Sequence, residues 1–253
     1  MNRVRAPFAL RPDPAVEVPD TAMVMAAGLG KRMRPLTATR PKPLVPVAGR
    51  TLLDRTFDHL RGAGIARAVV NVHYLADAVE AHLRARAQSL EIIISDERAK
   101  LLETGGGVVK ALPLIDRDTF FVINSDNLWV DGAIDTLKLI ASRWDDSAMD
   151  ALLLLVPYAR ALCHQGQGDF HMDAAGQLRR RAHARVAPFV YTGIQLISRR
   201  LIADPPPGAF STNIFWDRAI ENERLYGLVH PGLWFDVGTP QAVKRTEALL
   251  NQE

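Results

Sequence analysis

The sequence predicts an α/β protein with an open, mostly parallel sheet flanked by helices. Short apolar runs alternate along the chain with stretches in which apolar residues recur at helical spacing. A glycine-rich turn follows the first apolar run, and a later apolar run ends abruptly in polar residues. Crossover helices between parallel strands produce this alternation, and ligands of such sheets bind at the carboxyl ends of the strands.

Length and composition limit the class of protein. The 253 residues suit one large α/β domain, or a domain with a small lid, and an apolar content of 48% provides an ample core. The net charge of +3 is mildly basic, but no basic run is interleaved with aromatic residues. We therefore expect an anionic small substrate rather than nucleic acid. The lone Cys163 excludes an intramolecular disulfide and a cysteine metal cluster.

The chain shows no targeting or membrane segment. No apolar run approaches the roughly 20 residues that a membrane span requires, and the first residues lack the apolar core of a signal peptide. We therefore expect a cytoplasmic protein without membrane contact. Four prolines fall within residues 1–20, which are expected to form an extended N-terminal arm. Residues 21–253 are expected to form a single domain.

The first strand and the turn after it carry the strongest signal. Ala22–Ala26 is short and apolar, as a buried strand would be, and Ala27–Gly30 is a glycine-rich turn. Three basic residues follow it directly: Lys31, Arg32 and Arg34. Glycine lets backbone N–H groups approach phosphate oxygens closely, and nearby cations neutralise the phosphate charge. The turn lacks both the GK[ST] ending of ATPase phosphate loops and the third glycine of a dinucleotide fingerprint.

A further lysine stands between two prolines in Pro41-Lys42-Pro43. The prolines restrict the backbone on both sides of Lys42, so this lysine is held with little freedom. A strand, a loop and a solvated basic surface remain the alternative interpretation. The joint occurrence of glycines, cations and a rigid lysine favours an anion-binding site.

The next elements alternate between helix and strand. Residues 51–60 are predicted to form a helix that ends before Gly62, and residues 75–83 a second helix. Residues 68–72 and 91–94 are predicted strands. This order is typical of a parallel sheet with crossover helices.

A second glycine-rich segment, Leu102–Gly107, leads into a helix-like stretch over residues 108–112. Two interpretations stay open for it: a flexible loop before a helix, or a second edge of a ligand pocket. Further on, the apolar strand over residues 120–123 ends in Asn124-Ser125-Asp126. Asp126 at the end of a strand can hold Mg²⁺, although Asn-Ser-Asp is also ordinary turn chemistry.

The second half of the chain continues the α/β pattern and adds a hairpin. A helix over 134–144, a buried strand over 151–156, a hairpin over 166–179, a strand over 190–196 and a helix over 216–221 are predicted. Thr239 is expected to cap the last helix, and Asp236 precedes it at the end of an apparent strand. Asp236 is either a buried turn acid or a metal ligand.

The sequence lacks the motifs of other common catalytic sites. The seven histidines show no HExxH or other paired metal spacing, no GxSxG elbow occurs, and Cys163 has no evident activating partner. The sequence therefore does not predict a zinc, serine or cysteine hydrolase.

Residues 22–49, AMVMAAGLGKRMRPLTATRPKPLVPVAG, resemble the signature of the sugar-1-phosphate nucleotidylyltransferases, AAGxGxRMRPLT followed by PKPLVPV. Within that family the resemblance is strongest to the N-acetylmuramate-1-phosphate uridylyltransferases of bacterial cell-wall recycling, with the mannose-1-phosphate guanylyltransferases a near second. It extends from about Ala22 to the C-terminus. Lys31 departs from the pattern, because many members carry Thr there.

The resemblance implies the nucleotide-diphospho-sugar transferase fold, a Rossmann-like sheet with a small β-hairpin or lid region for the sugar. It implies transfer of a nucleotidyl group from a nucleoside triphosphate to a sugar 1-phosphate, with release of pyrophosphate. The expected substrates are UTP and N-acetylmuramate 1-phosphate. GTP with mannose 1-phosphate, or the substrates of another sugar-1-phosphate nucleotidylyltransferase, are the alternatives, and a non-catalytic nucleotide-sugar sensor is a further one. A monomer or small homo-oligomer is expected.

The resemblance also assigns roles to residues that match the family motifs. Catalysis is assigned to Arg32, Lys42 and Asp126, and Mg²⁺ binding to Asp126 and Asp236. Nucleotide binding is assigned to Ala27, Gly28, Gly30, Lys31, Arg32, Lys42, Gly105 and Gly106. Sugar binding is assigned to Glu103, Asn124, Gly168, Asp169, Thr192 and Gly193.

Two departures from the family pattern concern the substrate site. Ser125 replaces a glycine before the metal-binding acid, and the Glu-Lys-Pro motif, whose lysine holds the sugar phosphate in many relatives, is missing. The basic run Arg179-Arg180-Arg181 is either a solvated face or, together with Arg185, a source of partners for an anionic sugar substituent.

Overall fold

The computed structural model describes residues 17–86 and 90–251, so most of the predicted N-terminal arm, residues 1–16, lies outside the described residues. The helices are α1 (Leu52–Ala63), α2 (Ala76–Arg86), α3 (Glu103–Ala111), α4 (Thr136–Arg143), α5 (Asn213–Glu221) and α6 (Pro240–Leu250). The main sheet contains β1 (Thr21–Met25), β4 (Arg67–Val72), β5 (Glu91–Asp96), β6 (Thr119–Asn124), β8 (Ala151–Pro157), β10 (Phe170–Met172), β11 (Leu178–Arg180), β12 (Phe189–Ser198) and β13 (Leu225–Val229).

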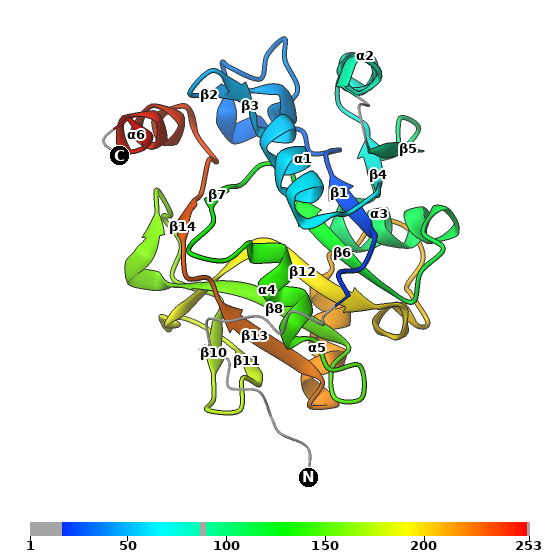
Figure 1. Cartoon of the computed structure of the whole chain (residues 1–253), viewed down its shortest axis with the longest axis vertical. Coiled ribbons are helices and arrows are strands. Elements are labelled where there is room, and N and C mark those ends of the chain that lie inside the picture. Colours follow the sequence, from blue (N-terminus) through cyan, green and yellow to red (C-terminus); the bar gives the residue numbers. More distant parts are fainter. Residues whose placement is uncertain (1–16, 87–89, 252–253) are drawn as a thin grey trace.

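Four parallel strands form the half of the sheet that the sequence predicts. Their order is β6-β1-β4-β5, and each pair is parallel (Figure 1). Their register aligns Met25 at the end of β1 with Asn71 of β4 and Asn124 of β6. The carboxyl ends of three strands therefore meet at one edge, where ligands of open α/β sheets bind.

The other half of the sheet contains antiparallel pairs. β12 pairs antiparallel with both β6 and β8, β13 pairs parallel with β8, and the predicted hairpin is confirmed as β10 and β11. The alternation of helices and strands does not reveal the direction of β12, because that direction is decided by contacts with β6 and β8. The register of β12 against β8 shifts between Tyr191 and Gln195, around Gly193.

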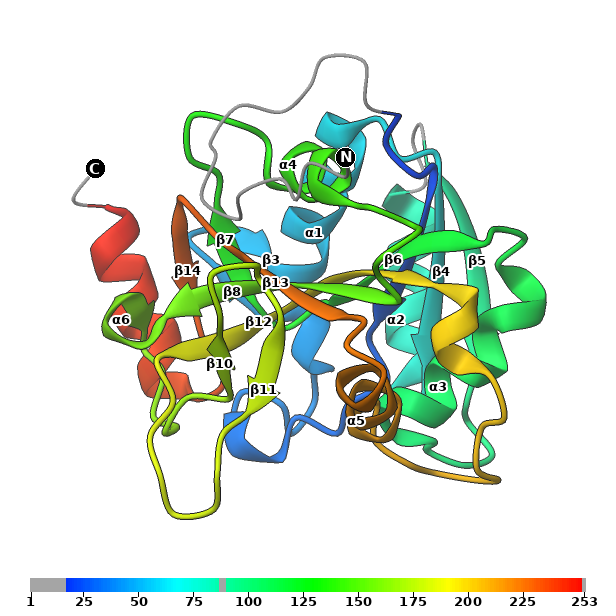
Figure 2. The same cartoon turned by 90° about the horizontal axis from the view of Figure 1, so that it is seen from below.

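Helices cover both faces of the sheet, which explains the continuous apolar character of its strands. Figure 2 shows α1 and α4 on one face and α3 and α5 on the other. One core cluster joins Phe57 of α1 and Ile140 of α4 to β1 and β6. A second joins Val108 of α3 and Phe215 of α5 to the opposite face. None of the helices in the described ranges combines the length and the apolar character that crossing a bilayer requires.

A small second sheet contains β14 (Leu233–Phe235), the strand that directly precedes Asp236. β7 (Leu128–Val130), β14 and β9 (Ala161–Leu162) pair in the order β7-β14-β9. Their apolar residues form a third cluster with Met33 and Val45. Met33 ends the short 3₁₀ turn η1 (Lys31–Met33), and Val45 follows a second one, η2 (Lys42–Leu44). The remaining short elements are β2 (Pro46–Val47), β3 (Arg50–Thr51), η3 (Leu112–Leu114), η4 (Tyr158–Arg160) and η5 (Arg199–Ile202).

The second glycine-rich segment is not a flexible loop before a helix, so that interpretation is wrong, whereas Leu101, Glu103 and Thr104 do line a cavity. Helix α3 begins at Glu103 and includes Gly105 and Gly106. A Cβ atom at Gly105 would lie 2.5 Å from the Phe210 ring, and one at Gly106 would lie 2.6 Å from the carbonyl oxygen of Gly208. The glycines are needed because a distant loop packs directly on this helix, and that contact is invisible in the sequence.

His230, at the end of β13, predicts a pH dependence of stability. The side chain is completely buried, and its ring nitrogens contact the Leu233 carbonyl (3.1 Å) and the Thr136 hydroxyl (3.5 Å). Burial lowers the pKa of His230 below its ordinary value of 6.5, against weaker opposing effects of hydrogen bonds and Asp131. The unfolded chain therefore takes up this proton first, and stability is lost as pH falls below about 6.5.

We expect the free energy of unfolding to fall between pH 7 and pH 5, and to fall less steeply in His230→Gln. Glutamine can still donate to the Leu233 carbonyl but does not titrate. Urea unfolding of both proteins at several pH values measures the difference. Equal slopes for the two proteins would show that His230 does not contribute to the pH dependence.

Candidate active site

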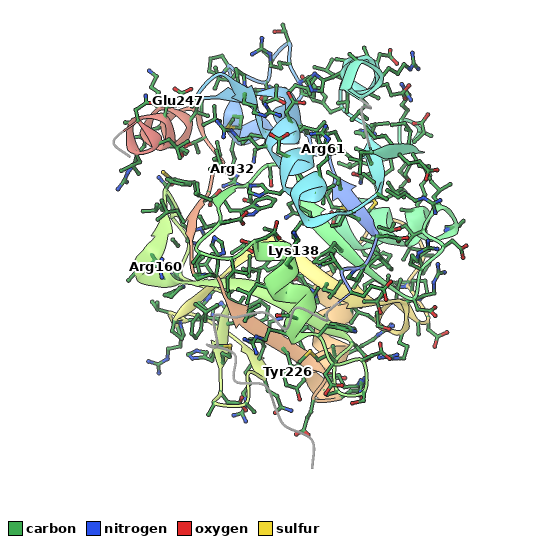
Figure 3. The ribbon with its side chains drawn as sticks, viewed as in Figure 1. Arg32, Arg61, Lys138, Arg160, Tyr226 and Glu247 are labelled. Atoms are coloured by element: carbon green, nitrogen blue, oxygen red, sulfur yellow. The ribbon has the colours of Figure 1, made fainter. Side chains whose placement is uncertain are left out.

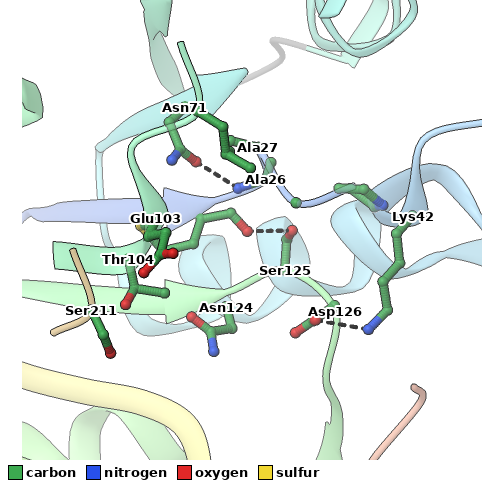
Figure 4. Close-up of a pocket in the computed structure, with 14 residues that line it drawn as sticks. Ala26, Ala27, Lys42, Asn71, Glu103, Thr104, Asn124, Ser125, Asp126 and Ser211 are labelled. Atoms are coloured by element: carbon green, nitrogen blue, oxygen red, sulfur yellow. Dashed lines mark hydrogen bonds and ion pairs between the residues drawn. The ribbon is translucent and has the colours of Figure 1, made fainter. Parts of the chain in front are cut away.

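A cavity of about 380 Å³ lies at the carboxyl ends of β1, β4 and β6 (Figure 4). It is lined by Met25, Ala26, Ala27, Gly28, Lys42, Pro43, Asn71, Leu101, Glu103, Thr104, Asn124, Ser125, Asp126 and Ser211. Six of the predicted site residues are among them: Ala27, Gly28, Lys42, Glu103, Asn124 and Asp126. The volume is within the range of small-molecule sites.

The two glycines of the first loop have different structural roles. Gly28 borders the cavity, and a Cβ atom there would meet no atom within 4 Å. Gly30 has φ +60°, and a Cβ atom there would lie 3.0 Å from Thr37 and 3.2 Å from the Cβ atom of Lys42. Gly30 thus allows the loop to turn closely against Lys42, while Gly28 leaves its backbone open to a ligand.

A buried polar pair fixes the start of this loop, and the sequence analysis did not identify it. The Asn71 Oδ1 atom accepts a hydrogen bond from the Ala26 N–H group at 2.7 Å. The Asn71 amide donates to Glu97 Oε1 at 2.8 Å, and Glu97 is completely buried. The second oxygen, Glu97 Oε2, accepts from the Leu102 N–H group at 3.2 Å. Nothing in the sequence around Glu97 indicates burial, because Asp96-Glu97-Arg98 is typical of a solvated loop.

Lys42 and Asp126 form an ion pair at the edge of the cavity. Lys42 Nζ lies 2.7 Å from Asp126 Oδ2, and the lysine side chain is 10% exposed whereas the aspartate side chain is 38% exposed (Figure 4). Lys42 begins the 3₁₀ turn η2, after Pro41 in the extended conformation. The backbone is therefore rigid where the ammonium group is placed, as the Pro-Lys-Pro sequence predicts.

Asp236 lies after β14 and close to positive charges. Its Oδ2 atom lies 3.0 Å from His164 Nδ1. Burial alone would raise the pKa of Asp236, but the His164 hydrogen bond and the charges of His164, Arg32 and Lys42 outweigh it and hold the pKa below its ordinary value. Asp236 is thus a carboxylate at neutral pH, and Asp126 and Asp236 both lie in the field of the Lys42 ammonium group.

Arg32 lies beside Asp236 rather than in the lining of the first cavity. A Cβ atom at Gly238 would lie 3.0 Å from Asp236 Oδ1 and 3.3 Å from the Arg32 guanidinium, so both groups border Gly238. With His164 and Thr239 they line a second cavity of about 340 Å³. The histidine was not predicted. Its Nε2 atom is buried without a hydrogen-bond partner among the described residues.

Several predicted residues do not line the first cavity. The N–H groups of Gly105 and Gly106 donate to the Phe210 carbonyl, at 2.8 and 3.2 Å. Lys31 is exposed on the turn η1. Of the arginine run, Arg180 pairs with Asp217 at 2.7 Å, and Arg181 donates to the Gly168 carbonyl at 2.9 Å. Their roles toward substrates stay predictions.

The residues assigned to the sugar fall into two groups. Asn124 lines the cavity, and Gly193 packs directly against it, because a Cβ atom at Gly193 would approach Asn124 Cβ at 3.0 Å. The Thr192 hydroxyl is buried and donates to the Leu154 carbonyl. The Asp169 carboxylate accepts from the Tyr191 N–H group at 2.8 Å, and Gly168 precedes it with φ +77°. Thr192 and Asp169 therefore hold the backbone of β12, and their assignment to the sugar stays a prediction.

Replacing Gly193 with alanine is expected to destabilise the protein by about 2–4 kcal/mol. The residue has φ +84°, and the added Cβ atom would overlap the Asn127 amide. Gly49→Ala is the matched control, since Gly49 has φ +75° but no atom within 4 Å of the place that the added methyl group would take. It isolates the backbone strain, at about 1 kcal/mol. Urea unfolding measures both, and equal losses would show that Gly193 is not required for close packing.

The carboxylates of Asp126 and Asp236 fit a magnesium site in which phosphate oxygens of a substrate supply the remaining ligands. Among the described residues no group of three or more His, Cys, Asp or Glu side chains could hold a metal ion by itself. Mg²⁺ usually binds one or two carboxylates together with phosphate oxygens and water. Lys42 and His164 each contact the Oδ2 atom of their aspartate, and no described residue donates to either Oδ1 atom. Asp126 and Asp236 therefore match this donor set.

Comparison with known proteins agrees with the geometry. A family model described as nucleotidyl transferase matches residues 21–163. The chain is similar to the N-acetylmuramate alpha-1-phosphate uridylyltransferase of Caulobacter vibrioides, with 45% identity over 92% of this chain and 98% of that protein. It is also similar to the protein of that name from Neisseria meningitidis, with 32% identity over 90% of this chain and 97% of that protein.

A solved structure shows the same fold. HddC from Yersinia pseudotuberculosis, complexed with GMP-PN, superposes with a TM-score of 0.72 and 22% identity, over 91% of this chain and 99% of that chain. The predicted fold class is therefore confirmed, and so is the resemblance carried by residues 22–49.

Proposed function

This chain belongs to the nucleotidyl transferase family, and on that premise we propose that it transfers a uridylyl group from UTP to N-acetylmuramate 1-phosphate, with release of pyrophosphate. The observation that carries the proposal is the Lys42–Asp126 pair at the edge of a cavity bordered by the glycine loop. The substrates are inferred from the names of two relatives that match this chain over almost its whole length.

In the proposed reaction a sugar-phosphate oxygen attacks the α-phosphorus of UTP in line. The nucleophile is already anionic, so no strong general base is needed, and the main obstacle is the charge of two polyanions. Lys42 would place its ammonium group where charge develops on the α-phosphate. Asp126 would hold that ammonium group in position. Arg32 would bind the outer phosphates, for which a guanidinium group offers two parallel donors.

The other proposed contacts follow from position. Gly28 would present its backbone to the phosphates, and Asn124 would face the sugar. Asp126 and Asp236 would hold Mg²⁺, which supplies charge neutralisation on the phosphate oxygens when bound. We also propose that residues 21–253 form one domain. Cytoplasmic placement and a monomeric or small homo-oligomeric state stay predictions.

A substrate matrix tests the function. Five triphosphates (UTP, GTP, CTP, ATP and dTTP) are combined with the 1-phosphates of N-acetylmuramate, mannose and glucose, and pyrophosphate release is measured. We expect the UTP and N-acetylmuramate 1-phosphate pair to give the highest kcat/KM. Dominant turnover of GTP with mannose 1-phosphate would replace the substrates while keeping the reaction. Binding without pyrophosphate release would instead indicate a nucleotide-sugar sensor.

A further inference from the structure

The two ends of the cavity differ in charge (Figure 4). Lys42 and Asp126 lie at one end, and Glu103, Thr104 and Ser211 lie at the other. If the proposed function holds, the phosphates of the nucleotide lie toward Lys42, because opposite charges attract. The base then lies toward Thr104 and Ser211, where Glu103 also repels phosphate.

The loop that contains Ser211 is hydrogen-bonded to the first turn of helix α3. The Phe210 N–H group donates to the Leu102 carbonyl at 3.1 Å, and the Phe210 carbonyl accepts from the Gly105 and Gly106 N–H groups. These two glycine amides are therefore engaged and cannot donate to a base without breaking the contact. Ser211 is held rigidly at the cavity, although it lies far from Thr104 in the sequence.

The hydroxyl groups of Thr104 and Ser211 each accept one hydrogen bond from a backbone N–H group. Thr104 Oγ1 accepts a hydrogen bond from the Thr212 N–H group at 2.9 Å, and Ser211 Oγ accepts from the Asn213 N–H group at 3.2 Å. A hydroxyl group has one hydrogen to donate in addition to its lone pairs. Neither hydroxyl donates to another described residue, so both hydrogens are available to a ligand.

We propose that Thr104 and Ser211 form a hydroxyl pair that selects a base carbonyl over a base amino group. Each hydroxyl hydrogen needs an acceptor, and the carbonyl O4 of uracil has two lone pairs that can accept. Cytosine carries an amino group at that position, which cannot accept and would leave the hydroxyl hydrogens unpaired. The hydroxyl pair thus favours UTP over CTP without any charged contact.

Ser211→Ala tests the hydroxyl pair. We expect kcat/KM for UTP to fall about 5- to 10-fold, mainly through KM, as loss of one neutral hydrogen bond predicts. The value for CTP should change little, so the preference for UTP shrinks by the same factor. Ser211→Thr and Thr104→Ser retain the hydroxyl groups and should retain the preference. If Ser211 had a purely structural role, Ser211→Ala would lower kcat/KM equally for UTP and CTP. That result, in which the preference for UTP is unchanged, would overturn the proposal.

A second measurement needs no variant. 4-Thio-UTP replaces O4 with sulfur, a weaker acceptor, so the unaltered protein should use it several-fold less well than UTP. Equal use of the two nucleotides would contradict the hydroxyl pair. If the protein does not use UTP at all, the proposed substrates fail, and the pair is tested with GTP against ATP, which carry a carbonyl and an amino group at position 6. An unchanged GTP preference in Ser211→Ala would then overturn it.

Discussion

Replacing Lys42 with alanine is expected to lower turnover by about 10²-fold or more, because one electrostatic stabiliser of the transition state is typically worth that much. The ammonium group lies 2.7 Å from Asp126, and the lysine side chain is only 10% exposed. Folding should be retained, since the partner carboxylate stays accessible to water. Pyrophosphate release under saturating UTP and sugar phosphate measures the loss.

The matched control is Lys138→Ala, which removes an exposed lysine from α4 (Figure 3). It should leave turnover and the midpoint of thermal unfolding nearly unchanged. Near-normal turnover in Lys42→Ala would remove this lysine from the mechanism. A large drop in its unfolding temperature would assign the lost activity to misfolding instead.

Asp126→Ala is expected to lower turnover by a similar factor of roughly 10² or more. This variant removes a proposed Mg²⁺ ligand and releases Lys42 from its ion pair. The two effects can be separated, because loss of a ligand also weakens metal binding. We therefore expect the Mg²⁺ concentration that gives half-maximal activity to rise in Asp126→Ala, but to stay unchanged in Lys42→Ala.

Direct metal binding provides a readout that does not depend on activity. Titration of the UTP-bound protein with Mn²⁺, followed by the loss of free-ion resonance, should show weaker binding in Asp126→Ala. Asp116→Asn, an exposed acid away from the cavity, is the control and should bind Mn²⁺ as the unaltered protein does. Unchanged Mn²⁺ binding in Asp126→Ala would exclude this aspartate as a ligand.

Local sequence patterns account for much of the fold. The parallel strands β1, β4, β5 and β6 each have an apolar centre, with side chains packed on both faces of the sheet. Thr239 caps α6 by accepting from the Ala242 N–H group, as its position before Pro240 predicts. The antiparallel β12 and the helical start of α3 escaped prediction, because both depend on contacts with segments far along the chain.

Some residues of the candidate site could likewise be identified from local sequence patterns, and others could not. The glycine loop, Lys42 and Asp126 could be identified because they belong to short continuous motifs at strand ends. Glu97 and His164 could not, since each is defined by a partner distant in the sequence: Asn71 for the glutamate and Asp236 for the histidine. The spacing of residues along the chain does not encode such pairs.

By itself, the sequence determined the parallel half of the sheet, the glycine loop after β1 and the acids at the strand ends. These features follow from residue periodicity, glycine and proline stereochemistry, and side-chain charge, all of which act over a few neighbouring residues. Only the tertiary structure decided that the loop at Phe210 occupies the amides of α3, that Ser211 faces the cavity, and that His164 holds Asp236. Those contacts arise when the packed core brings distant segments within hydrogen-bonding distance, so no local pattern can specify them.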